Sequence, residues 1–230
     1  MAKQKTTIQF HGETIELYGD GTAYLPSYET LIVSDLHLEK GAALSKGAPL
    51  PQFDTMDTLA RLKEAQIRCQ PATLICLGDS FHNISRAFQM PKNYLDMLHQ
   101  MAELSAFIWI TGNHDDYLPD RLPGKSCKEH FVGAIRFCHE ADGLPMTPTI
   151  SGHYHPKARV KLRARHLSAP CFIESSLDLI MPSFGSYTGG LSITDKALKP
   201  YLSKQSKIHL CHDKAIYSLP YSPLHFAAPY

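Results

Sequence analysis

The chain has 230 residues and a formal charge of +1, with 43% hydrophobic and 20% charged residues. These values are typical of a soluble globular protein, and we expect residues 1–230 to form a single domain with a large core. A charge so close to zero excludes a polycation, so any attraction to nucleic acid has to come from a local patch.

Two further absences narrow the class of protein. No apolar run reaches the roughly 20 residues that span a bilayer, and the N-terminus lacks the apolar stretch of a secretory signal. The six cysteines are scattered and form no Cys-x-x-Cys pair. We therefore expect a cytoplasmic protein with reduced thiols and no membrane contact.

Apolar periodicity in the first half of the chain predicts alternating strands and helices. The expected strands are Thr6–Phe10, Thr14–Tyr18, Thr22–Leu25, Thr30–Ser34, Thr73–Leu77 and Phe107–Ile110, and the expected helices are Phe53–Arg68 and Pro91–Leu104. From residue 30 to residue 110 the order is strand, helix, strand, helix, strand. This order predicts an α/β sheet with helical crossovers.

The second half of the chain carries little helical signal. Its expected strands are Ala134–Cys138, Thr149–Ser151, Ala158–Arg165 and Leu191–Thr194. The segment Pro182–Gly190 is either a loop over the active site or a glycine-rich turn between strands. Residues 201–230 show little periodicity and are expected to wrap the surface of the same domain, with His209 and His212 exposed to solvent.

Five polar clusters each follow a short apolar run. They are Asp35-Leu36-His37, Gly78-Asp79, Gly112-Asn113-His114-Asp115, Cys138-His139-Glu140 and Gly152-His153-Tyr154-His155. The carboxyl ends of strands in an open α/β sheet form the ligand crevice, so these side chains are expected to converge. Their oxygen and nitrogen donors favour Mn, Fe, Mg or Zn.

Local spacing supports the same interpretation. Residues i and i+2 of an extended segment face one side, so Asp35 and His37 can hold one ion, as can His153 and His155. A glycine precedes Asp79, Asn113 and His153, and we expect it to let the backbone turn sharply away from the sheet.

The ordered motifs resemble the calcineurin-like metallophosphoesterase superfamily over residues 31–156. The resemblance implies an α/β fold, a β-sandwich flanked by helices in α/β/β/α layers, with two divalent metal ions at the strand ends. It places Asp35, His37 and His155 on one ion, Asn113, His139 and His153 on the other, and Asp79 between them. Manganese is the first expectation, with Fe, Zn or Mg as alternatives.

The resemblance also assigns roles around the ions. It makes His114 the catalytic histidine beside the scissile phosphate, where it stabilises developing charge or protonates the leaving oxygen. Asp115 is expected to orient a histidine. His82 stands where most superfamily members have an acidic residue, and it is either an ordinary surface histidine or a group that faces the substrate.

Further segments resemble the ligase-associated DNA-damage-response phosphoesterases. They are Asp35-Leu36-His37-Leu38-Glu39-Lys40-Gly41, Gly78-Asp79-Ser80-Phe81-His82, Pro170-Cys171-Phe172, Pro182-Ser183-Phe184-Gly185 and Gly189-Gly190. This resemblance covers most of the chain up to about residue 195. It implies a DNA-repair setting, endonuclease activity, and an ATP-dependent DNA ligase and a helicase as partners.

A basic stripe begins two residues after His155. Its alternate positions are Lys157, Arg159, Lys161, Arg163 and Arg165, with small or apolar residues between them. On a strand these cations share one face, where they either bind a polyanion or protect an edge strand from pairing. The nearby metal motifs favour nucleic acid, although the absence of interleaved aromatic residues does not indicate base stacking.

The sequence therefore predicts metal-dependent hydrolysis of phosphodiesters, in DNA or RNA. One alternative is a phosphatase or phosphodiesterase that acts on a small nucleotide or phosphorylated metabolite. The other is a non-catalytic scaffold with the same fold. A complete set of seven ligands plus His114 argues against the scaffold, because binding alone does not require it.

Overall fold

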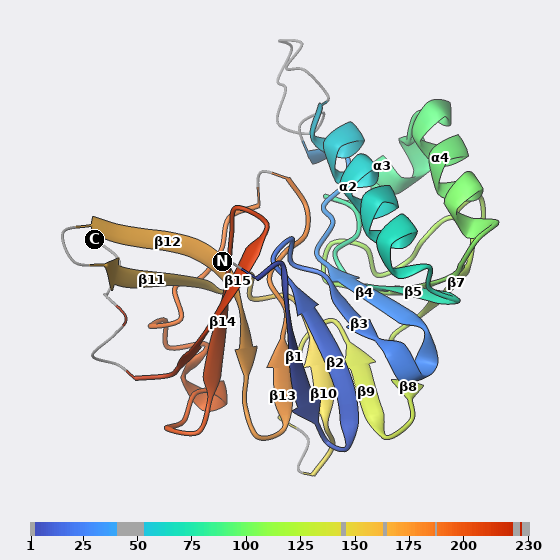
Figure 1. Ribbon diagram of the computed structural model, residues 1–230. Helices are drawn as coiled ribbons and strands as arrows, with labels where there is room; N and C mark the ends of the chain where they lie inside the picture. The colour runs from blue at the N-terminus through green and yellow to red at the C-terminus, as the bar shows by residue number, and fades with distance from the viewer. Residues whose placement is uncertain are drawn as a thin grey trace.

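Two β-sheets pack face to face in the computed structural model, and helices cover the outer side of one of them (Figure 1). The structure describes residues 3–40, 53–143, 146–162, 165–186, 188–222 and 226, with the backbone alone at Phe53, Leu162 and Arg165. This arrangement confirms the predicted α/β class and the sandwich flanked by helices.

The first sheet has the strand order β1-β2-β3-β4-β5-β6-β7. Its strands are β1 (Lys5–Phe10), β2 (Glu13–Tyr18), β3 (Ala23–Leu25), β4 (Thr30–Ser34), β5 (Thr73–Leu77), β6 (Ala106–Ile110) and β7 (Lys125–Cys127), and the 3₁₀ turn η1 (Pro26–Tyr28) precedes β4. Strands β4 to β7 are parallel neighbours, so their carboxyl ends lie along one edge of the sheet.

Helical crossovers make this parallel order possible. Helix α2 (Phe53–Cys69) connects β4 to β5, while α3 (Ile84–Gln89) and α4 (Lys92–Ala102) connect β5 to β6. The apolar faces of α2 and α4 pack on the first sheet around Leu62, Leu98 and Trp109. None of the described helices is both long enough and apolar enough to cross a membrane.

The second sheet has the order β15-β14-β12-β13-β10-β9-β8. Its strands are β8 (Glu129–Val132), β9 (Ile135–Cys138), β10 (Thr149–Ser151), β12 (Arg165–Glu174), β13 (Asp178–Ile180), β14 (Lys207–His212) and β15 (Ala215–Pro220). Strand β11 (Lys157–Leu162) lies outside this order and pairs with β12. Strands β9 and β10 are parallel, which brings Cys138 and Ser151 side by side at their carboxyl ends.

The core between the sheets brings the metal motifs together. Ile32, Leu77 and Ile110 from the first sheet pack against Phe137 and other residues of the second. This contact sets the carboxyl ends of β4, β5 and β6 opposite those of β9 and β10. On the outer side of the second sheet, a further core includes residues of the segment 193–202, which contains the 3₁₀ turn η2 (Lys199–Tyr201).

Several elements differ from the sequence predictions. Leu191–Thr194 is wrong as a strand, since only Ser192 makes an isolated bridge, and the strand expected over Ala158–Arg165 ends at Leu162. The elements α3, β7, β8, β12 and β13 were not predicted. Most of them are too short to show a period, and α3 has six residues capped by the Asn83 side chain, which accepts from Arg86 N.

The chain after Tyr201 does more than cover the domain surface, because residues 207–220 supply β14 and β15. His209 was expected to be exposed, yet it is 1% exposed. Its ring lies between Ser218 Oγ at 2.7 Å and Glu174 Oε2 at 2.9 Å. These two partners satisfy both ring nitrogens, so a buried histidine is tolerated here.

Candidate metal centre

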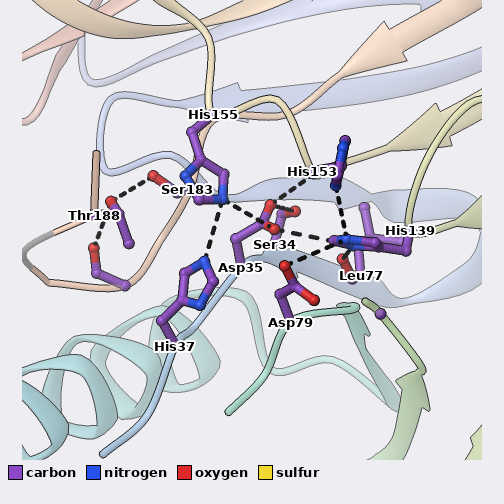
Figure 2. A network of polar contacts seen from close by, with 12 residues as sticks. Ser34, Asp35, His37, Leu77, Asp79, His139, His153, His155, Ser183 and Thr188 are labelled. Carbon is purple, nitrogen blue, oxygen red and sulfur yellow. Dashed lines mark hydrogen bonds and ion pairs between the residues drawn. The ribbon is translucent and has the colours of Figure 1, made fainter. Parts of the chain in front are cut away.

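Six of the seven predicted ligands, all but Asn113, are seen in Figure 2 to meet where the strands of both sheets end. Asp35 follows β4 directly and Asp79 lies two residues beyond β5. His139 follows β9 directly, and His153 lies two residues beyond β10. Convergence therefore follows from the parallel order of the strands and the packing of the two sheets.

The first ligand group consists of Asp35, His37 and His155, whose donor atoms lie within 4.8 Å of one another. His37 Nε2 lies 3.3 Å from His155 Nε2, and His155 Nε2 lies 3.1 Å from Asp35 Oδ1. Both side chains of the Asp35–His37 pair are buried. The group joins the end of β4 to the loop that leads into β11.

The second ligand group consists of Asp79, His139 and His153. His139 Nε2 lies 3.5 Å from Asp79 Oδ2 and 3.1 Å from His153 Nδ1. Asn113 extends the group, with its Nδ2 atom 3.4 Å from His153 Nδ1. His139 Nδ1 donates to the Leu77 carbonyl at 3.0 Å, and this bond orients the ring so that Nε2 faces the group.

The two groups are adjacent and suit divalent cations. His139 Nδ1 lies 3.9 Å from Asp35 Oδ1, and the His153 backbone N–H donates to Asp35 Oδ2 at 3.0 Å. Within the described part of the chain, the buried Asp35 Oδ1 atom accepts no hydrogen bond. A buried carboxylate oxygen and imidazole nitrogens that face one another at about hydrogen-bond distance are the donor set that divalent transition metals bind.

The backbone at the site is strained. Five of the seven predicted ligands have positive φ: Asp35 52°, His37 45°, Asp79 44°, His153 71° and His155 46°. The expectation of extended i, i+2 pairs was therefore wrong in its backbone geometry. His153 and His155 also point to different groups instead of sharing one. Left-handed backbone at non-glycine residues is costly and concentrates at functional sites.

Close contact with neighbouring atoms is the main reason that glycine is needed before the ligands. Of the three glycines before the ligands, Gly78 alone has a positive φ. A Cβ atom on Gly112 would overlap the Asp79 backbone nitrogen and Oδ1, and one on Gly152 would overlap the Ser34 hydroxyl. The predicted sharp turn thus applies to Gly78, whereas the other two allow the loops to approach closely.

Burial and charge shift the titration of the ligands in opposite directions. Burial lowers the pKa of His37 to about 4. At His139, burial alone would lower the pKa. The hydrogen bond and charge of Asp79, together with the charge of Asp35, outweigh this effect and raise the pKa to about 9. At Asp79, burial alone would raise the pKa, but the hydrogen bond to His139 outweighs this effect and lowers it. Metal binding would therefore displace a proton from His139.

The catalytic candidates lie at the open side of the centre. His114 is exposed, its backbone N–H donates to Asp79 Oδ1 at 2.9 Å, and its Nε2 lies 3.8 Å from Asp79 Oδ2. The His82 ring stacks on His114 with a centroid separation of 6.0 Å. Among the described contacts, Asp115 binds the backbone N–H groups of Gly112 and Phe81, and not a histidine as expected.

Two other predicted features lie beside the centre. Lys157, Arg159 and Lys161 occupy β11, while Arg163 and the Arg165 side chain fall outside the described residues. In Pro182–Gly190, Phe184 N donates to Ser34 O at 2.7 Å and Gly185 N to Asp35 O at 3.1 Å. This part of the segment therefore braces the backbone that carries Asp35. Tyr187 falls outside the described residues.

Sequence reasoning missed the residues that support the ligands. The Ser34 hydroxyl donates to Asp35 Oδ2, and Glu140 Oε1 lies 3.6 Å from His153 Nε2. Glu140 also accepts from the Tyr154 hydroxyl at 3.2 Å. Each of these residues is next to a ligand in sequence, but a serine or glutamate at such a position has no distinctive spacing.

The fold and the two ligand groups define a metal-dependent phosphoesterase, and sequence comparison agrees. Residues 28–182 match the calcineurin-like phosphoesterase family, to which this chain belongs. It is therefore a hydrolase of phosphoric esters, of a family that uses divalent metals. No curated protein matches the sequence.

Two solved structures show the extent of the similarity. Nuclease MPE of Pseudomonas putida is 27% identical, with a TM-score of 0.73 over 94% of this chain and 100% of that chain. Yfce, a phosphoesterase from E. coli, is 14% identical, with a TM-score of 0.43 over 83% of this chain and 98% of that chain.

Replacement of Gly152 by Ala is expected to weaken Mn²⁺ binding by at least about 10-fold, because the new methyl group displaces Ser34 and Asp35. Isothermal titration calorimetry measures this affinity. Gly189→Ala is the matched control, since nothing lies within 4 Å of its Cβ position. Equal affinities in the two variants, both folded by circular dichroism, would contradict the packing role of Gly152.

Proposed function

We propose that the protein hydrolyses phosphodiester bonds in nucleic acid with two divalent cations bound at the adjacent ligand groups. Asp35, His37 and His155 would hold one ion. His139, His153 and Asn113 would hold the other, and Asp79 would bridge both. The observation that carries the proposal is the pair of adjacent oxygen and nitrogen donor groups at the carboxyl edge of the sheets. Manganese is the proposed metal, with Fe, Zn or Mg as alternatives.

Bound ions would lower the pKa of a water molecule and neutralise charge on the phosphate oxygens. The protein's own groups fix where this happens. Asp35 and Asp79 are almost fully buried and supply the negative charge, and Asp115 ties the loops after β5 and β6 together. The donors are thus held in place before a substrate arrives, which is what electrostatic preorganisation requires.

His114 is the proposed proton donor to the leaving oxygen. Half of its side chain is exposed, and the bond from its backbone to Asp79 fixes its position. His82 lies against it with near-parallel rings, 18° apart. Two imidazoles at the solvent side of the centre can hydrogen-bond a phosphate oxygen or transfer a proton.

The hairpin of β11 and β12 is the proposed contact for the nucleic-acid backbone. It projects from the edge of the sandwich beyond the part of β12 that pairs with β14 (Figure 1). Ala158 and Val160 are buried, so the alternating Lys157, Arg159 and Lys161 lie on the opposite face of β11. The similarity to a nuclease at 27% identity supports a nucleic-acid substrate.

The biological setting is a further part of the proposal. On the sequence resemblance described above, we place this activity in DNA repair, with an ATP-dependent DNA ligase and a helicase as partners. A small nucleotide or phosphorylated metabolite is the alternative substrate. The projecting basic hairpin favours the polymer, because its alternating cations can contact several successive phosphates of one chain.

The proposed chemistry is tested first on a simple diester. With added Mn²⁺ the wild-type protein is expected to hydrolyse bis(p-nitrophenyl) phosphate. Asp79→Asn should lower kcat by at least about 100-fold, since it removes a charge of the second group that is proposed to bridge both ions. The release of p-nitrophenolate measures the rate. An unchanged rate in this variant would refute the proposed site.

The role of His114 is expected to depend on the leaving group. His114→Asn should slow hydrolysis of the dinucleotide TpT by about 100-fold or more, because its sugar alkoxide needs a proton. The effect on bis(p-nitrophenyl) phosphate should be much smaller, since p-nitrophenolate leaves unprotonated. Chromatography of TpT products gives the rate, with His130→Asn as the control. Equal losses on both substrates would exclude proton donation.

The role of the basic hairpin is tested by the dependence of DNA binding on salt concentration. The double variant Arg159→Ala, Lys161→Ala should retain hydrolysis of the simple diester but cleave plasmid DNA more slowly. The slope of log Kd for DNA against log salt should fall by roughly 2, about one unit for each lost phosphate contact. Lys63→Ala, Lys125→Ala removes two exposed charges elsewhere as a control. The same slope in both double variants would count against the hairpin.

A further inference from the structure

Two pairs of stacked rings connect the segment after β5 to the segment after β6. The inner pair is His82 with His114, beside the metal centre. The outer pair is Phe88 in α3 with Tyr117, with ring centroids 6.2 Å apart and planes at 23°. The inner pair belongs to the proposed catalytic machinery, whereas no step described so far uses the outer pair.

The outer pair is unusually exposed for large aromatic side chains. Phe88 is 49% exposed and Tyr117 is 56% exposed, while their chain neighbours Ala87 and Leu118 are buried in the core under the helices. The backbone beneath the rings is fixed, since Arg121 Nη2 donates to Ala87 O at 3.2 Å and to Met90 O at 2.8 Å. The rings are therefore held outward on rigid segments, with apolar faces in contact with solvent.

The position of the pair relates it to the reaction. Tyr117 follows His114 by three residues, so their Cα atoms are at most about 11 Å apart even in a fully extended chain. Near the inner pair, the positive charges of Lys40 and Arg86 act on His82. A phosphate bound there would place the adjoining nucleoside within reach of the outer rings.

The charges around Tyr117 indicate what kind of group can bind. Asp116 and Asp120 are exposed on the same loop. Carboxylates so close to the rings repel a phosphate, so they do not favour a contact with the nucleic-acid backbone at this point. An uncharged aromatic ligand is unaffected, because stacking depends on the ring faces.

We propose that Phe88 and Tyr117 form a stacking site for an unpaired nucleobase next to the scissile phosphate. The inference rests on the proposed function and adds to it a specificity-determining contact outside the metal centre. Every base has a π-face, so this contact tolerates any sequence. It requires the base to be out of a duplex, because both faces of a paired base are covered by its neighbours.

The experiment compares a base-containing with a base-free strand. Binding of fluorescent dT12, and of a 12-mer of abasic tetrahydrofuran units with the same phosphates, is measured by anisotropy with Ca²⁺ in place of Mn²⁺. Phe88→Leu, Tyr117→Leu keeps apolar volume but removes both rings. It should weaken dT12 binding by about 10-fold and leave the abasic strand unchanged.

The control for this experiment is a ring that lies away from the metal centre. Phe131→Leu replaces a ring of similar exposure, 53%, at the far end of β8, and should alter neither affinity. If the double variant, with an unchanged melting temperature, binds both strands as the wild type does, the stacking site is overturned. The same result is expected if the rings bind a protein instead of a base, and it overturns the stacking site in that case too. Failure of the wild type to bind either strand would refute the proposed nucleic-acid function itself.

Discussion

The buried carboxylate of Asp35 is the constraint on which the rest of the structure depends. It is 1% exposed, its Oδ2 atom accepts hydrogen bonds from the Ser34 hydroxyl and the His153 backbone N–H, and its Oδ1 atom lies 3.1 Å from His155 Nε2. Removing such a charge from water is costly unless opposite charge or hydrogen bonds compensate. Strand β4 of the first sheet and the loop after β10 of the second sheet must therefore keep a fixed relative position. The core between the sheets maintains that position through contacts such as Leu77 with Phe137.

The strained backbone follows from the same requirement. Asp35, Asp79, His139 and His153 lie within two residues of a strand end, so the chain must turn sharply there to bring these donors together. Left-handed conformations at Asp35, Asp79 and His153 achieve this turn, and Gly112 and Gly152 leave space for the returning loops. Such strain persists because the surrounding sheets are rigid and closely packed. The site is thus a property of the sandwich and not of any one loop.

The sequence predicted the elements with long or regular apolar patterns and the residues with metal-binding side chains. Strand β5 is a continuous apolar run, helix α4 shows a clear helical period, and Asn113 with its neighbours forms a distinctive motif. Short elements such as α3 and β8 have too few residues to show a period. His209 could not be placed, since its burial depends on Glu174 and Ser218 in two other strands. Phe88 and Tyr117 are far apart in sequence, so only the fold reveals them as a pair.

Exposure increases from the metal centre outward, and this gradient indicates the kind of substrate that fits. Asp35 and Asp79 are 1% and 4% exposed, whereas the His114 side chain is 50% exposed and the Tyr117 residue 56%. Enzymes for small ligands usually enclose most of the ligand surface. The described residues around this centre include the exposed rings of Phe88 and Tyr117, on the segments after β5 and β6, and the basic positions of β11, which begin two residues beyond His155. The proposed nucleic-acid substrate would contact both features while one of its phosphates lies at the proposed metal centre. The exposed rings and the basic hairpin therefore support the proposed polymeric substrate on grounds independent of the ligand set.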